Sequence, residues 1–133
     1  MILVDSSVWI DFFRGASTAP SRALTQCLGD ASIDVGMPDL VLFEVMRGFR
    51  PGALMREAQA LMGALTQVHI GGAENALQAA ERYRRLRAMG RTVRSPIDVL
   101  LASYCMSHGH VLLQRDADFE SLKALGSLDT WPQ

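Results

Sequence analysis

Short apolar runs alternate along this chain with longer segments in which apolar residues recur at helical spacing. The runs predict buried strands at residues 2–4, 33–35, 67–70 and 111–113, with a last short strand at 127–129. The longer segments predict helices that begin near residues 7, 21, 39, 51, 73, 96 and 118. Because strands and helices alternate, we expect an α/β fold, a three-layer α/β/α sandwich around a mostly parallel sheet.

A carboxylate stands at the junction of the first strand and the first helix. Asp5 ends the apolar run at 2–4, and either Ser6 or Ser7 could cap the helix that follows. In open α/β sheets, ligands bind at the carboxyl ends of the strands, so Asp5 occupies a candidate site position. The alternative is a purely structural role, in which Asp5 caps the helix or braces the turn.

Length, charge and cysteine content narrow the class of protein. The 133 residues suit one domain over 1–133, and the net charge of −1 does not indicate a surface that binds polyanions over its whole extent. We find no apolar run long enough to span a membrane and no signal peptide. Neither Cys27 nor Cys105 has metal-binding spacing. We therefore expect a reduced, cytoplasmic protein without a membrane part.

Two further acids lie in predicted helices that begin at the same edge of the sheet as Asp5. Glu44 lies in a helix that is apolar nearly all round, which favours a buried or functional role over an ion pair with Arg47. Asp98 comes three residues after Ser95, and the alternative for it is the acidic position of a capping box.

Two more acids, Asp116 and Asp118, directly follow the predicted strand at 111–113, and either would cap the next helix. The carboxyl ends of parallel strands and the amino ends of the helices share one edge, so we expect all five acids to reach one pocket. Clustered carboxylates repel each other unless a cation compensates them, and hard divalent cations such as Mg²⁺ or Mn²⁺ prefer oxygen ligands. One or two such ions suit phosphodiester hydrolysis. No histidine has a spacing that suggests zinc.

The second half of the long predicted helix and the loop after it are strongly basic. No acid occurs between Arg82 and Ile97, and the segment holds six arginines: Arg82, Arg84, Arg85, Arg87, Arg91 and Arg94. Several of these arginines are explained simply as residues on the solvent-exposed face of the helix. The local positive field also suits a phosphate backbone, and we expect Arg91 and Arg94 to contact RNA.

Four segments together resemble the PIN-domain ribonucleases, and specifically the VapC toxins of type II toxin–antitoxin pairs. They are Leu3-Val4-Asp5-Ser6-Ser7-Val8-Trp9-Ile10, Phe43-Glu44-Val45-Met46-Arg47-Gly48, Arg94-Ser95-Pro96-Ile97-Asp98 and Leu113-Gln114-Arg115-Asp116-Ala117-Asp118-Phe119. The resemblance spans nearly the whole chain in the family's order, and no single segment is specific by itself.

The resemblance implies a Mg²⁺-dependent endoribonuclease, with Mn²⁺ as a substitute, inhibited by a cognate VapB-like antitoxin and forming a homodimer. It carries metal-centre and catalytic roles to Asp5, Glu44, Asp98 and Asp116. Asp118 also fits the acidic pattern, so the choice of fourth acid stays open. Ser7 would support the centre by holding a metal-bound water or a phosphate oxygen. The RNA target stays open among transfer-RNA loops, ribosomal-RNA loops and messenger RNA.

Two other functions compete with this one. A haloacid-dehalogenase-type phosphatase needs a second Asp two residues after the nucleophile, where this chain has Ser7. A non-catalytic PIN-like module that binds RNA or protein would be marked by loss of the acids, and none is missing.

The helix at 8–13 carries two adjacent apolar stripes, and one small sheet cannot easily cover both. With the apolar helix at 41–46, it predicts a groove in which an antitoxin segment binds beside the acids. We expect Trp9, Phe13 and Met46 to contact the antitoxin. The alternative is that these residues are simply core.

Overall fold

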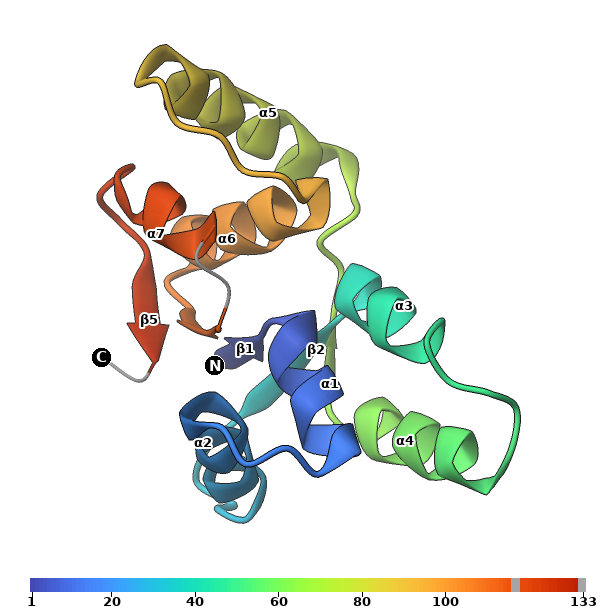
Figure 1. Cartoon of the computed structure of the whole chain (residues 1–133). Coiled ribbons are helices and arrows are strands. Elements are labelled where there is room, and N and C mark those ends of the chain that lie inside the picture. The colour runs from blue at the N-terminus through green and yellow to red at the C-terminus, as the bar shows by residue number, and fades with distance from the viewer. Residues whose placement is uncertain (116–117, 132–133) are drawn as a thin grey trace.

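The structure, a computed structural model, describes residues 1–115 and 118–131, and for Asp118 the backbone alone (Figure 1). The described residues form five strands and seven helices. In chain order these are β1 (Ile2–Val4), α1 (Ser6–Arg14), α2 (Ala19–Leu28), β2 (Val35–Pro38), α3 (Asp39–Met46), α4 (Ala53–Gly63), β3 (Thr66–Val68), α5 (Ala73–Ala88), α6 (Pro96–His108), β4 (Val111–Leu113), α7 (Asp118–Lys123) and β5 (Asp129–Trp131).

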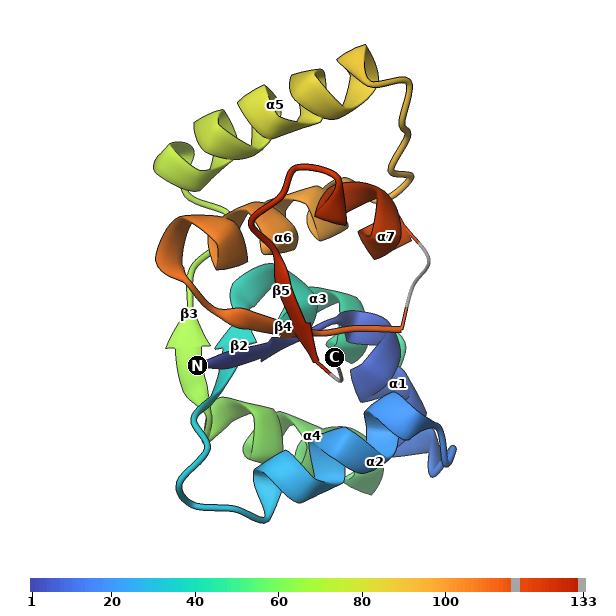
Figure 2. The ribbon, with the colours of Figure 1, turned by 90° about the vertical axis from the view of Figure 1, so that its left-hand side faces the viewer.

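All five described strands run parallel in one sheet of order β3-β2-β1-β4-β5. The central strand β1 pairs with β2 and β4, and Val4 lies opposite Leu113. Figure 2 shows α6 and α7 over one face of the sheet and α2 and α4 over the other, with α5 lying outside α6. This arrangement confirms the expected α/β/α sandwich with a parallel sheet.

The second strand lies further along the chain than the apolar pattern predicts. Instead of 33–35, it covers Val35–Pro38, which includes two residue types that are rare in strands. A Cβ at Gly36 would lie 2.5 Å from both Leu3 Cδ2 and Met1 Sδ, so a larger residue there would make these two side chains move. The pairing of this strand with β1 and β3 thus includes residues whose own strand propensity is low.

The helix α6 lies between the sheet and α5 (Figure 2) and is buried along most of its length. The side-chain amide of Asn75 donates to the carbonyls of Ile70 and Leu100, at 2.8 and 3.0 Å, and so ties the start of α5 to α6. Burial raises the pKa of the Cys105 thiol to about 12, as suits an unreactive core thiol. Among the described helices, none combines the length and the apolar character needed to cross a bilayer.

Candidate active site

Asp5 lies where β1 ends and α1 begins, and it is only 3% exposed. Its backbone N–H donates to the Leu113 carbonyl at 3.0 Å, which fixes the residue to the end of β4. Its carboxylate accepts hydrogen bonds from the Ser7 N–H at 3.3 Å and from the Ser7 hydroxyl. Asp5 is therefore the N-cap of α1, as its structural alternative proposes, and it also stands at the sheet edge where ligands bind.

Glu44 on α3 is half-buried and lies within the electrostatic reach of Asp5. Burial is the largest effect on Glu44 and raises its pKa, and the Asp5 charge raises it further. The nearby Ser6 side chain and the Arg47 charge lower the pKa, but the net shift is upward. The Glu44 atom Oε1 is buried and has no hydrogen-bond partner in the described part of the chain. Such an atom is an acceptor oxygen available to a ligand.

The alternative role of Glu44, an ion pair with Arg47, is wrong. The ion pairs found within the described residues join Arg115 to Asp11 and Lys123 to Glu120, and neither involves Glu44. The Arg47 guanidinium lies instead over the Phe43 ring, 5.5 Å from its centroid.

Two serines hold the carboxylates at the start of α1. The Ser7 hydroxyl donates to Asp5 Oδ2, so in this structure it orients an acid rather than a water or a phosphate. The Ser6 hydroxyl lies 3.5 Å from Asp5 Oδ1 and also acts on Glu44. Sequence reasoning considered Ser6 only as a helix cap and missed this link, because the link depends on where α3 packs.

Asp98 lies in the first turn of α6, as predicted, and is 5% exposed. Its backbone N–H donates to Ser95 Oγ at 3.4 Å, which is one half of the capping-box alternative. Asp116 lies outside the described residues. Asp118 is the first residue of α7, and its side chain also lies outside the described part of the chain.

The five acids are therefore brought together only in part. Asp5 and Glu44 lie within electrostatic reach of each other, but within the described residues no group of three or more Asp, Glu, His or Cys side chains could hold a metal ion. Asp98 thus does not complete a three-acid group with them, and the roles of Asp116 and Asp118 stay predictions. The pair of Asp5 and Glu44 fits a hard cation, because a buried acceptor oxygen without a partner among the described residues lies within reach of a second carboxylate charge.

The arginines of the basic segment divide into structural and exposed members. Arg82 Nη1 donates to the Ser103 carbonyl and hydroxyl at 2.8 and 2.7 Å, and to the Ser107 hydroxyl at 2.7 Å, so this side chain fastens α5 to α6. Both arginines predicted to bind RNA, Arg91 and Arg94, are exposed. Their role in RNA binding stays a prediction.

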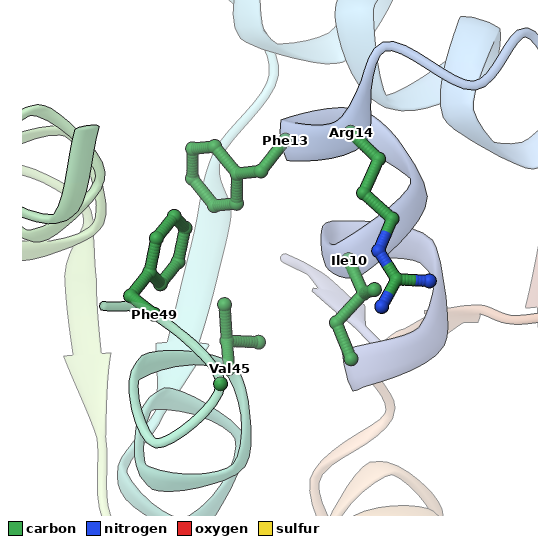
Figure 3. Close-up of a pocket in the computed structure, with 6 residues that line it drawn as sticks. Ile10, Phe13, Arg14, Val45 and Phe49 are labelled. Carbon is green, nitrogen blue, oxygen red and sulfur yellow. The ribbon is translucent and has the colours of Figure 1, made fainter.

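An apolar pocket of about 170 Å³ opens between α1 and α3 (Figure 3). Its lining residues are Ile10, Phe13, Arg14, Val45, Gly48 and Phe49. The rings of Phe13 and Phe49 meet edge to face with their centroids 5.5 Å apart. The pocket lies between the two helices for which the sequence predicts a groove.

The residues predicted to line that groove are corrected in two places. Phe13 lines the pocket, whereas Met46 is half-buried and does not line it. Trp9 is 0% exposed, so the prediction that it offers an accessible surface is wrong. The reason is that α1 packs against both α2 and α3, which together with the sheet cover more than one stripe of the helix.

Comparison with known proteins gives consistent matches over nearly the whole chain. Residues 2–125 match the family model described as PIN domain. Ribonuclease VapC11 of Mycobacterium tuberculosis is 28% identical over 128 residues, covering 96% of each chain. Among solved structures, VapBC2 of Rickettsia felis bound to a promoter DNA fragment matches with a TM-score of 0.72 and 15% identity, covering 98% of this chain and 97% of that one. VapC20 of M. tuberculosis, described as a sarcin-ricin loop cleaving toxin, matches with a TM-score of 0.66 and 21% identity, covering 97% of this chain and 98% of that one.

Proposed function

Because the chain belongs to the PIN domain family, we propose that it is a divalent-metal-dependent endoribonuclease and the toxin of a toxin–antitoxin pair. The observation that carries this proposal is the pair of Asp5 and Glu44 at the sheet edge, with Glu44 Oε1 buried and unpartnered among the described residues. The curated relatives that are named VapC ribonucleases support the same class of activity.

Asp5 and Glu44 would hold Mg²⁺, or Mn²⁺ in its place, with Asp98 and either Asp116 or Asp118 as further ligands or as acids that orient the attacking water. A bound divalent cation supplies the positive charge that favours ionised water and stabilises a leaving oxygen in phosphodiester hydrolysis. The residues of this chain prepare the centre. The Ser7 hydroxyl and N–H hold the Asp5 carboxylate in one orientation, and Glu44 Oε1 offers an acceptor for a proton or a cation.

The test is a cleavage assay on labelled single-stranded and structured RNAs. We expect products with Mg²⁺ or Mn²⁺, none with EDTA, and recovery when metal is added back. The competing function, a module that binds RNA or protein without cutting, predicts binding under all three conditions and no products. A wild-type protein that binds RNA but never cleaves it with either metal would refute the enzyme proposal.

The proposed antitoxin contact is the pocket between α1 and α3. It is apolar, it is lined by Phe13 and Phe49, and Arg14 on its rim could pair with an acid of the partner (Figure 3). Phe49→Ala should weaken binding of the cognate antitoxin, measured by calorimetry after co-expression. Leu54→Ala is the matched control, because Leu54 is 73% exposed on α4 and does not line the pocket. Equal affinities for the two variants would place the antitoxin elsewhere.

The homodimer implied by the resemblance stays a prediction, which sedimentation of the purified chain would test.

A further inference from the structure

A second and larger groove, about 490 Å³ in volume, lies between α5 and α6. It is distinct from the pocket between α1 and α3 and shares no lining residue with it. On α5 its wall is formed by successive turns of one helix face, where small alanines leave the hollow and Tyr83 and Arg84 stand at one end. Three of its lining residues, Tyr83, Arg84 and Arg94, are exposed, so the groove is open to solvent.

The groove combines an apolar floor, an aromatic ring and two cations. Val93 and Val99 are 7% and 5% exposed and form part of the floor. Tyr83 lines the groove and is 38% exposed, so one part of its ring is available to a ligand. Arg84 and Arg94 also line it and are exposed. A ring with cations beside it is the arrangement with which proteins stack a base and hold the phosphates of single-stranded nucleic acid.

The groove and Asp98 both involve the first turn of α6. Pro96 and Val99 line the groove, and Asp98, between them in sequence, is buried in the same turn. Asp98 itself does not line the groove. The volume falls within the range of about 300–1,000 Å³ that is typical of small-ligand sites, which is enough for a nucleobase.

Charge decides which occupant the groove favours. Five lining residues, Tyr83, Arg84, Val93, Arg94 and Pro96, belong to the segment from Arg82 to Ile97, which contains six arginines and no acid. An apolar protein segment would gain nothing from these cations, whereas a phosphate backbone would.

We propose that this groove binds single-stranded RNA, with one base stacked on Tyr83 and adjacent phosphates contacted by Arg84 and Arg94. The proposal rests on the proposed function for the choice of RNA as the ligand. RNA binding in the groove does not itself require metal.

The first experiment measures RNA binding without cleavage. The full chain is titrated, in EDTA, into a fluorescein-labelled 12-nucleotide single-stranded RNA of mixed sequence, and anisotropy is recorded. Tyr83→Ala should weaken binding roughly 5- to 150-fold, the range for loss of one base–aromatic stack, and Tyr83→Phe should retain the wild-type affinity. Arg84→Gln should weaken binding more than Arg85→Gln, a matched control because Arg85 is exposed on the same helix and does not line the groove.

The second experiment observes Tyr83 by NMR in the wild-type protein, so it tests RNA binding in the groove even if Tyr83→Ala fails to fold. The chain has two tyrosines, and Tyr104 packs against the rings of His108 and His110. With ring-labelled tyrosine, RNA should shift the Tyr83 signals and leave those of Tyr104 unchanged.

Three results would overturn the proposal: wild-type affinity for RNA in Tyr83→Ala, Tyr83 signals that move with the antitoxin but not with RNA, or loss of self-association in Tyr83→Ala without loss of RNA binding. The last two would assign the groove to a protein partner or to a second copy. If RNA shifts Tyr83 but the wild type cleaves no RNA with Mg²⁺, the groove stands and the proposed ribonuclease function fails.

Discussion

The Ser7 hydroxyl, in the first turn of α1, donates a hydrogen bond that orients the Asp5 carboxylate. Ser7→Ala removes a donor to Oδ2 of a carboxylate that is 3% exposed, and it leaves the 3.3 Å bond from the Ser7 N–H to Oδ1. The Asp5 side chain thus keeps one of its two bonds from this residue. We expect the variant to fold and to hold its acid less precisely.

The size of the effect follows from the hydrogen bond that the substitution removes. A hydrogen bond to a charged group is worth about 1.5–3 kcal/mol, and we expect the low end, about 1.5 kcal/mol, because Ser7 is only half-buried and water can replace its hydroxyl. Removing a group that orients a metal-binding residue typically costs about 10- to 100-fold in metal affinity or activity. We therefore expect at least a roughly tenfold higher Mg²⁺ concentration for half-maximal cleavage.

The measurement is a Mg²⁺ titration of the initial cleavage rate, with thermal melts in EDTA. Ser32→Ala is a close control, since Ser32 also stands two residues after an aspartate and its hydroxyl donates to Asp30 Oδ1 at 2.6 Å on the exposed surface. We expect that control to change stability by less than about 0.5 kcal/mol and to leave the titration unchanged. Identical Mg²⁺ titrations for Ser7→Ala and Ser32→Ala would refute the idea that Ser7 positions the metal-binding acid.

Three further predictions concern Glu44, Trp9 and the exposed arginines. Burial raises the pKa of Glu44 above the ordinary 4.5. Its negative charge therefore destabilises the metal-free fold at pH values above the folded-state pKa and has no effect below the unfolded-state pKa. Glu44→Gln should raise the melting temperature at about pH 7 and lose this gain near about pH 4. A gain of the same size at both pH values would contradict this. Trp9→Ala should reduce the free energy of unfolding by about 3–5 kcal/mol in urea titrations, because the ring is fully buried and stacked on Phe13. A loss below about 1 kcal/mol would mean that the ring is not in the core. Arg91→Gln with Arg94→Gln should weaken RNA binding and flatten the slope of log affinity against log salt by about 0.7 for each phosphate that is no longer neutralised, and an unchanged slope would remove both residues from the interface.

The parts of the fold that the sequence predicts well are those in which a local pattern fixes the structure. The apolar runs at β1 and β4 are buried because both strands lie in the interior of the sheet, and Asp5 follows β1 directly as the pattern indicates. The start of α6 is also predicted correctly, since Ser95 and Pro96 are residues typical of helix starts and Ser95 Oγ does accept from the Asp98 N–H.

The errors lie where a neighbour distant in sequence decides the outcome. The β2 strand includes Gly36 and Pro38, and it forms through pairing with β1 and β3, which nothing in residues 35–38 alone reveals. The two apolar stripes of α1 predict that Trp9 is available for binding, but α2 and α3 pack on this helix and the ring is buried. Ser6 acts on Glu44 only because α3 folds against α1, so the sequence alone does not reveal that it links the two acids.

Cleavage of labelled RNA by Asp5→Asn and Asp98→Asn, beside the exposed control Asp30→Asn, tests the catalytic metal centre most directly. Each of the first two variants removes a buried carboxylate while keeping nearly the same side-chain volume; Asp5 belongs to the acidic pair of the candidate site, and Asp98 is the predicted further ligand. We predict that both melt cooperatively, as the wild type does, but give no cleavage products with Mg²⁺ or Mn²⁺, and that Asp30→Asn cleaves at the wild-type rate. Wild-type cleavage by either Asp5→Asn or Asp98→Asn would contradict the assignment of these acids to a catalytic metal centre.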